Sequence, residues 1–138
     1  MMAAFKREAW MIVIGIGCRR HCVVGALREL LALALVQCPG QVPRGLASHR
    51  LKANEPALLA LADELRLPLF TYDSPALAHL HPRLTHHSAI TLERTGCAGV
   101  AESAALAHCE YLTGQPALLR VARIANGQAT LAIAQGTP

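Results

Sequence analysis

Residues 15–20, Gly-Ile-Gly-Cys-Arg-Arg, have the residue types needed to hold an anion. They follow an apolar, β-branched run and precede a helical pattern, which is where α/β proteins bind ligands, at the carboxyl ends of strands. Backbone N–H groups at Gly15 and Gly17 and the N-terminus of the following helix would favour carboxylate or phosphate oxygens. The guanidinium groups of Arg19 and Arg20 add charge that pairs with the same oxygens. We predict an anion-binding turn; a tight turn with solvated arginines is the alternative.

A thiol lies in the same run. Cys18 is spaced four residues from Cys22, at the predicted start of a helix. A cysteine at a helix N-terminus can have a lowered pKa and become nucleophilic. The alternative is a packed or simply exposed thiol.

Two further places bring together residues suited to acid–base chemistry. Ser48, Lys52 and Glu55 follow the second expected strand, where an ammonium and a carboxylate can bind an acidic substrate or transfer protons. Gly96 lies in a loop before a helix that has Glu102 in its first turn. Helix capping, surface solvation and the preference of Glu for helix N-termini explain the same residues equally well, so both interpretations stay open.

Several common sites are not indicated. Gly25 comes too late after Gly17 to complete a dinucleotide-binding fingerprint, and there is no Walker loop or nucleophile elbow. Four histidines lie close together, with Cys97 beyond them, but they lack the spacing of known metal sites; they are His79, His81, His86 and His87. We therefore expect no metal and no cofactor.

The elements that must position these residues alternate along the chain. Expected strands cover residues 10–14, 45–48, 67–71, 117–124 and 128–134, and expected helices cover residues 23–36, 54–65, 73–80 and 100–112. Asn54 is the expected N-cap of the second helix, with Pro56 in its first turn. Residues 83–99 are expected to form a long loop, and Asn126–Gly127 predicts a hairpin between the last two strands. This alternation is typical of an α/β protein.

Composition narrows the class further. The chain has 138 residues, a formal charge of +4, 4% aromatic residues and five cysteines at irregular spacing. We expect one domain over residues 1–138 and free thiols. No apolar run reaches the roughly 20 residues needed to cross a membrane, and the N-terminus lacks a secretory pattern. A cytoplasmic protein that binds an anionic small molecule, with no membrane or nucleic-acid partner, is expected.

Three segments in the same order, residues 14–20, 46–55 and 99–106, together with residues 129–134, resemble the family of CobE and the C-terminal domain of CbiG, from cobalamin biosynthesis. Residues here that match the family pattern are Gly15, Gly17, Cys18, Arg19, Ser48, Lys52, Glu55, Gly96 and Glu102. The chain departs from that pattern at His21, where the family usually has a glycine or small residue, and at residues 97–98.

The resemblance implies a three-layer α/β/α fold with a mostly parallel sheet and a C-terminal antiparallel hairpin. Longer family members, the cobalt-precorrin-5A hydrolases, open a lactone on a cobalt-corrinoid intermediate and release a two-carbon aldehyde. This chain has about the length of the C-terminal domain alone, so the resemblance leaves that hydrolase activity open.

We therefore expect a protein that binds a precorrin-type tetrapyrrole and carries it or assists a hydrolytic or rearrangement step. Arg19, Arg20 and Lys52 would pair with its carboxylates. In a catalytic protein, Glu102 or Glu55 would be the general acid or base and Ser48 a hydrogen-bond donor. The alternative is a non-catalytic partner of other corrin biosynthetic enzymes.

Overall fold

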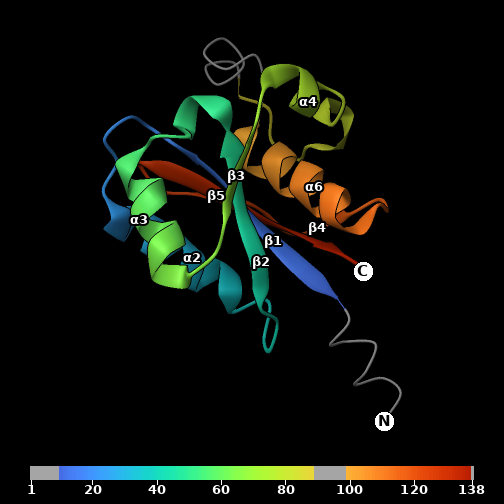
Figure 1. Ribbon diagram of the computed structural model, residues 1–138, viewed down its shortest axis with the longest axis horizontal. Helices are drawn as coiled ribbons and strands as arrows, with labels where there is room; N and C mark the ends of the chain where they lie inside the picture. The colour runs from blue at the N-terminus through green and yellow to red at the C-terminus, as the bar shows by residue number, and fades with distance from the viewer. Residues whose placement is uncertain (1–9, 89–98, 138) are drawn as a thin grey trace.

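The computed structural model describes residues 10–88 and 99–137 and is built on a five-stranded sheet of order β3-β2-β1-β5-β4 (Figure 1). β1 pairs with β2, and β2 with β3, in parallel, whereas β5 is antiparallel to both β1 and β4. The strands are β1 (Met11–Cys18), β2 (Pro43–His49), β3 (Leu69–Tyr72), β4 (Leu118–Ala125) and β5 (Ala129–Gly136). All strands except β5 therefore point in the same direction.

Helices cover both faces of the sheet, as Figure 1 shows. α2 (Val24–Leu35) and α3 (Pro56–Leu65) pack on one face, and α4 (Ser74–Ala78) and α6 (Val100–Thr113) lie on the other. Short 3₁₀ turns η1 and η2 cover Arg50–Lys52 and His81–Arg83. The three-layer α/β/α fold with its C-terminal hairpin is confirmed, and none of the described helices is long and apolar enough to cross a membrane.

β1 is the central strand, and its side chains alternate between the two cores. Ile12, Ile14 and Ile16 are fully buried against α2 and α3, whereas Met11 and Val13 belong to the core beneath α6. This alternation is that of a strand buried on both faces, as expected for the middle of a three-layer protein.

The prediction that residues 15–17 form a turn is wrong, because β1 continues through Cys18. Gly15 lies on the α6 face, where an added Cβ would be 1.9 Å from the carbonyl oxygen of Ala101 and 2.8 Å from the Cβ of Ala105. Here glycine allows a helix to pack closely on the strand, rather than allowing the chain to turn. The turn itself comes later, at residues 19–21.

The helix starts differ in detail from the prediction. Glu55, not Asn54, is the N-cap of α3, because η1 and Ala53 extend the preceding turn and Pro56 occupies the first helical position. α4 begins as expected after Asp73, whose side chain accepts a hydrogen bond from the Ala76 N–H at 3.2 Å. It ends at Ala78, earlier than predicted.

The C-terminal hairpin forms where Asn126–Gly127 predicted it. The Asn126 Oδ1 atom accepts hydrogen bonds from the N–H groups of Gln128 and Ala129, both at 3.0 Å. The β4–β5 pairing shifts register twice, between Leu119 and Val121 and again between Val121 and Ile124. β4 is therefore an irregular edge strand.

Candidate functional site

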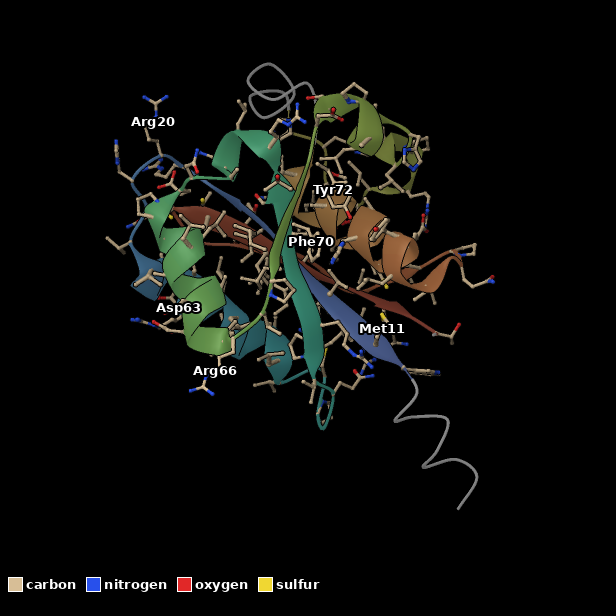
Figure 2. The ribbon with its side chains drawn as sticks, viewed as in Figure 1. Met11, Arg20, Asp63, Arg66, Phe70 and Tyr72 are labelled. Carbon is tan, nitrogen blue, oxygen red and sulfur yellow. The ribbon has the colours of Figure 1, made fainter. Side chains whose placement is uncertain are left out.

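A cleft of about 890 Å³ opens at the carboxyl ends of β1 and β2, between the β4–β5 hairpin and the N-terminus of α6. Gly17, Val100 and Ala129 contribute small or apolar lining, and η1 contributes Lys52. Figure 2 shows Arg20 projecting into solvent at this end of the sheet, opposite the end at which Met11 lies. This is the location at which open α/β sheets bind ligands.

Positive charge dominates the lining. Four cations, Arg19, Arg20, Lys52 and Arg123, line the cleft, and the carboxylates among its described lining residues are Glu55 and Glu102. Within the described parts of the chain, the three arginine side chains form no salt bridge and no hydrogen bond. The cleft therefore presents unpaired cations to a ligand, whereas both of its carboxylates are occupied by groups of the protein.

Glu55 holds the turn that carries the arginines. Its Oε2 atom accepts a hydrogen bond from the His21 N–H at 3.1 Å, and its Oε1 atom lies 3.8 Å from the Lys52 ammonium. His21 has a φ of 62°, in the left-handed region that favours glycine. The family usually has a glycine or small residue at this position. Histidine adopts the left-handed conformation more readily than most other residues, so it fits here. Glu55 is 8% exposed and links three neighbouring segments.

Glu102 is the most heavily hydrogen-bonded side chain of the site. Its carboxylate accepts hydrogen bonds from the N–H groups of Thr85 (2.8 Å), His86 (3.2 Å) and Arg123 (3.0 Å), and from the Thr85 hydroxyl. Burial raises the pKa of this carboxyl, but the hydrogen bonds from Thr85, Arg123 and His86 together outweigh burial and lower it. A carboxylate stabilised in this way is a weak base, and it joins the residue 85–86 segment, β4 and α6.

Ser48 lies outside the cleft lining. It is fully buried, and its hydroxyl donates a 2.6 Å hydrogen bond to the carbonyl oxygen of Ile16. The side chain therefore ties β2 to β1, and the structure does not bring it together with Lys52 and Glu55 around a ligand space.

Of the two alternatives for Cys18, the lowered pKa is wrong, and the structure agrees with the packed thiol. Burial, followed by the neighbouring Cys22 thiol, raises the pKa of Cys18 to about 12. The physical reason is that Cys18 ends a strand, whereas α2 begins only at Val24, so the thiol does not lie at the N-terminus of that helix. The described cysteines, Cys18, Cys22, Cys38 and Cys109, are free thiols.

The three glycines that were predicted to bind a ligand differ in where the structure places them. Gly17 lines the cleft, whereas Gly15 is covered by α6. Both belong to the β1–β5 ladder and not to a turn, so the predicted cradle of turn N–H groups is not formed there. Gly96, like Cys97, lies outside the described residues.

Arg123 and His49 are among the lining residues that sequence reasoning missed. His49 is 5% exposed; its Nδ1 accepts a hydrogen bond from the Leu51 N–H, and its Nε2 is 2.9 Å from the Ser74 hydroxyl. Its position directly at the end of a parallel strand is a signal that could have found it. Arg123 has no such signal, because it lies inside a strand of ordinary appearance.

The histidine-rich stretch brings only two rings together, His81 and His87, with centroids 4.5 Å apart. Within residues 10–88 and 99–137, no three His, Cys, Asp or Glu side chains are grouped so that they could hold a metal ion.

Comparison with protein families matches residues 12–134 to the family described as cobalamin synthesis G C-terminus. The chain belongs to this family. The match runs from β1 into β5 and therefore includes every described residue that lines the cleft. The family resemblance inferred from the sequence is confirmed.

Individual relatives agree with this assignment. The chain is similar to protein CobE of Sinorhizobium sp., with 37% identity over 126 residues, covering 89% of this chain and 79% of the relative. It is also similar to a crystal structure of CobE, a protein from the cobalamin (vitamin B12) biosynthetic pathway, with a TM-score of 0.86, 38% identity, and coverage of 92% and 91% of the two chains. The cobalamin biosynthesis protein chiG of Agrobacterium tumefaciens str. C58 matches with a TM-score of 0.65, 32% identity, and coverage of 89% and 96%.

Proposed function

We propose that this chain, a cobalamin biosynthesis protein of the CobE and CbiG C-terminal type, binds a precorrin-type tetrapyrrole in the cleft. The observation that carries the proposal is the set of unpaired arginines, Arg19, Arg20 and Arg123, around a cleft whose two carboxylates are already hydrogen-bonded. Precorrins carry carboxylates around the edge of a macrocycle, and guanidinium groups bind carboxylates through paired hydrogen bonds.

The size and lining of the cleft support the same ligand class. A volume of about 890 Å³ falls in the range of roughly 300–1,000 Å³ that is usual for ligand pockets. Gly17, Val100 and Ala129 offer little side-chain bulk at the inner wall, so a broad ring can approach it. Arg19 and Arg20 are exposed at the rim, where they can meet the outer carboxylates.

The hydrogen bonding favours binding or carriage over catalysis. Glu102 is a weak base, and Glu55 is engaged by His21 and Lys52. A hydrolytic or rearrangement step using either carboxylate would first require it to give up these partners, and Ser48 would have to leave the Ile16 carbonyl. We therefore place ligand binding ahead of turnover.

The test is a visible-absorbance titration of the protein with precorrin intermediates. Arg19→Ala and Lys52→Ala should weaken binding, each by about ten- to a hundredfold, since a hydrogen bond to a charged group contributes roughly 1.5–3 kcal/mol. Arg44→Ala is the matched control, because Arg44 is exposed near the start of β2, at the opposite end of that strand.

Absence of binding to every intermediate by the unmodified protein would overturn the proposal. Docking on other corrin biosynthetic enzymes, with no ligand in the cleft, would then be the better account. Under that account Arg19→Ala and Lys52→Ala would leave association with those enzymes unchanged.

A further inference from the structure

The irregular part of β4 places one cation inside the cleft. Val121 pairs with Ile133 and Ile124 pairs with Leu131, so Ala122 and Arg123 together stand opposite Ala132 alone. One extra residue on one strand of an antiparallel pair is the pattern of a β-bulge, and bulges often redirect a side chain beside a functional site.

The bulge decides the face on which Arg123 lies. Val121 and Ile124 both pack into the core beneath α2 and α3, although they are three residues apart. Regular alternation would put Arg123 on the same face as Val121, away from the cleft. With the bulge, Arg123 lies on the α6 face and lines the cleft beside Val100.

Glu102 accepts a hydrogen bond from the backbone of the bulge. The Arg123 N–H donates to the Glu102 carboxylate at 3.0 Å. Glu102 is 1% exposed and is held in turn by the residue 85–86 segment, so it is a fixed acceptor. It therefore stabilises the backbone conformation that directs the Arg123 side chain into the cleft.

The side chain of Arg123 lacks a partner of its own. Its Nε atom is buried and makes no hydrogen bond in the described part of the chain. Buried polar atoms in proteins are nearly always hydrogen-bonded, so an unpartnered Nε atom at a cleft wall is available to an acceptor on a bound ligand. By contrast, Arg120 on the same strand donates from Nη2 to the Gln37 carbonyl oxygen at 2.6 Å and does not line the cleft.

We propose that Arg123 determines the specificity of the cleft for carboxylate-bearing tetrapyrroles by binding one ligand carboxylate through its guanidinium edge, and that Glu102 is the residue that positions it. The inference rests on the proposed function, because it assumes that a tetrapyrrole occupies the cleft. It adds that the ligand is selected by its carboxylates and not by the ring alone.

The first experiment compares two stable corrins as probes. Cobyrinic acid carries carboxylate side chains, and in cobinamide amides replace them. Unmodified protein should bind cobyrinic acid more tightly, and Arg123→Gln should weaken that binding by about ten- to a hundredfold. Arg123→Lys, which keeps the charge but loses the fork of donors, should give an intermediate loss.

Arg120→Gln is the matched control, since it removes the same charge from the same strand outside the cleft. Its affinity for cobyrinic acid should stay within about twofold of the unmodified protein. Circular dichroism and thermal unfolding of each variant would separate a lost contact from a lost fold.

The role of Glu102 is tested by a double-mutant cycle. Glu102→Gln should weaken cobyrinic acid binding when Arg123 is present and cause no further loss in the Arg123→Gln background. An effect through overall stability would be equal in both backgrounds, and that result would remove the positioning role.

The outcomes separate the two proposals. If unmodified protein binds cobyrinic acid and Arg123→Gln binds it equally well, the role of Arg123 is wrong while the tetrapyrrole site stands. Equal affinity of the unmodified protein for both corrins would overturn selection by carboxylates. Binding of neither these corrins nor any precorrin would overturn the tetrapyrrole site itself, and the role of Arg123 with it.

Discussion

Glu102 and His108 are two of the buried ionisable side chains of helix α6, and they differ in charge state: the first is charged and the second is neutral. Glu102, in its first turn, is 1% exposed and stays ionised, because donors from Thr85, His86 and Arg123 outweigh the cost of burial. His108, six residues further along, is fully buried, and burial lowers its pKa to about 4. Among the described residues its ring makes one hydrogen bond, at 2.7 Å between its Nδ1 and the Tyr72 hydroxyl.

The difference shows that the number of hydrogen-bond partners, rather than burial alone, decides whether a buried group keeps its charge. The charged group lies at the cleft and organises it. The neutral group packs between β2 and β3, stacked on Phe70 with ring centroids 4.2 Å apart, and its Nε2 atom has no partner in the described part of the chain. The first turn of the helix therefore lies at the cleft, whereas His108 packs against β3.

The largest effect is expected from Glu102→Ala. It would leave three backbone N–H groups, on Thr85, His86 and Arg123, without their acceptor. Since a hydrogen bond to a charged group contributes roughly 1.5–3 kcal/mol, losing these part-buried bonds should lower the free energy of unfolding by about 3 kcal/mol or more. Urea unfolding measures this loss. Glu29→Ala, at an exposed position on α2, is the control and should change stability by less than about 0.5 kcal/mol.

Acidification should affect the two groups in separate pH ranges. An unfolded histidine binds a proton below its ordinary pKa of 6.5, whereas folded His108 binds one only near pH 4. The unfolded state therefore holds more protons in this range, and stability should fall by up to about 3 kcal/mol as the pH drops from 6.5 to 4. Glu102, with its lowered pKa, should contribute a further loss only below its ordinary value of 4.5.

Urea unfolding at a series of pH values compares the unmodified protein with His108→Gln. The variant should lose less stability between pH 6.5 and 4. Identical slopes for the two proteins in that range would show that His108 is not buried in its neutral form.

A smaller effect is expected from Tyr72→Phe. Burial, followed by the neighbouring Tyr111, raises the pKa of Tyr72 to about 12, so its hydroxyl remains a neutral hydrogen-bonding group. Removing it takes away the hydrogen bond between the Tyr72 hydroxyl and the His108 ring and should cost about 1 kcal/mol. Thermal unfolding at pH 7 measures the change. A loss as large as that of Glu102→Ala would contradict the contrast between the two sites.

The smallest effect is expected at an ion pair that is not buried. Arg28 on α2 and Glu64 on α3 form a hydrogen-bonded pair whose side chains are 54% and 41% exposed. Water screens such pairs, so Glu64→Ala should leave the midpoint of thermal unfolding unchanged within error. A clear drop would show that charge pairing at the surface also contributes to joining the two helices.

Residue patterns were sufficient to predict most elements. The β-branched run of β1, the periodic apolar positions of α2 and α3 and the Asn126–Gly127 turn each predicted an element that the structure contains. These signals are local, since they depend on side-chain period and on turn chemistry within a few residues. The glycines at residues 15–17 led to a wrong prediction of a turn. Close packing of α6 on Gly15 requires glycine just as a turn does, so the residue type alone could not distinguish the two.

The candidate site could be predicted only in part. Arg19, Arg20, Lys52, Glu55 and Glu102 line the cleft as a group, because the ends of parallel strands meet at one edge of the sheet. The role of Ser48 could not be foreseen, and the sequence left open whether Cys18 is a reactive or a packed thiol. The Ile16 carbonyl that engages Ser48 and the burial that keeps the Cys18 thiol protonated both come from tertiary packing.

The sequence by itself determined the alternation of strands and helices, the family and the excess of cations near one end of the sheet. Only the tertiary structure decided that Glu102 is saturated by donors from two distant segments and that a bulge turns Arg123 into the cleft. The physical reason is that charge state and side-chain direction depend on partners brought together by folding. No spacing along the chain encodes those partners.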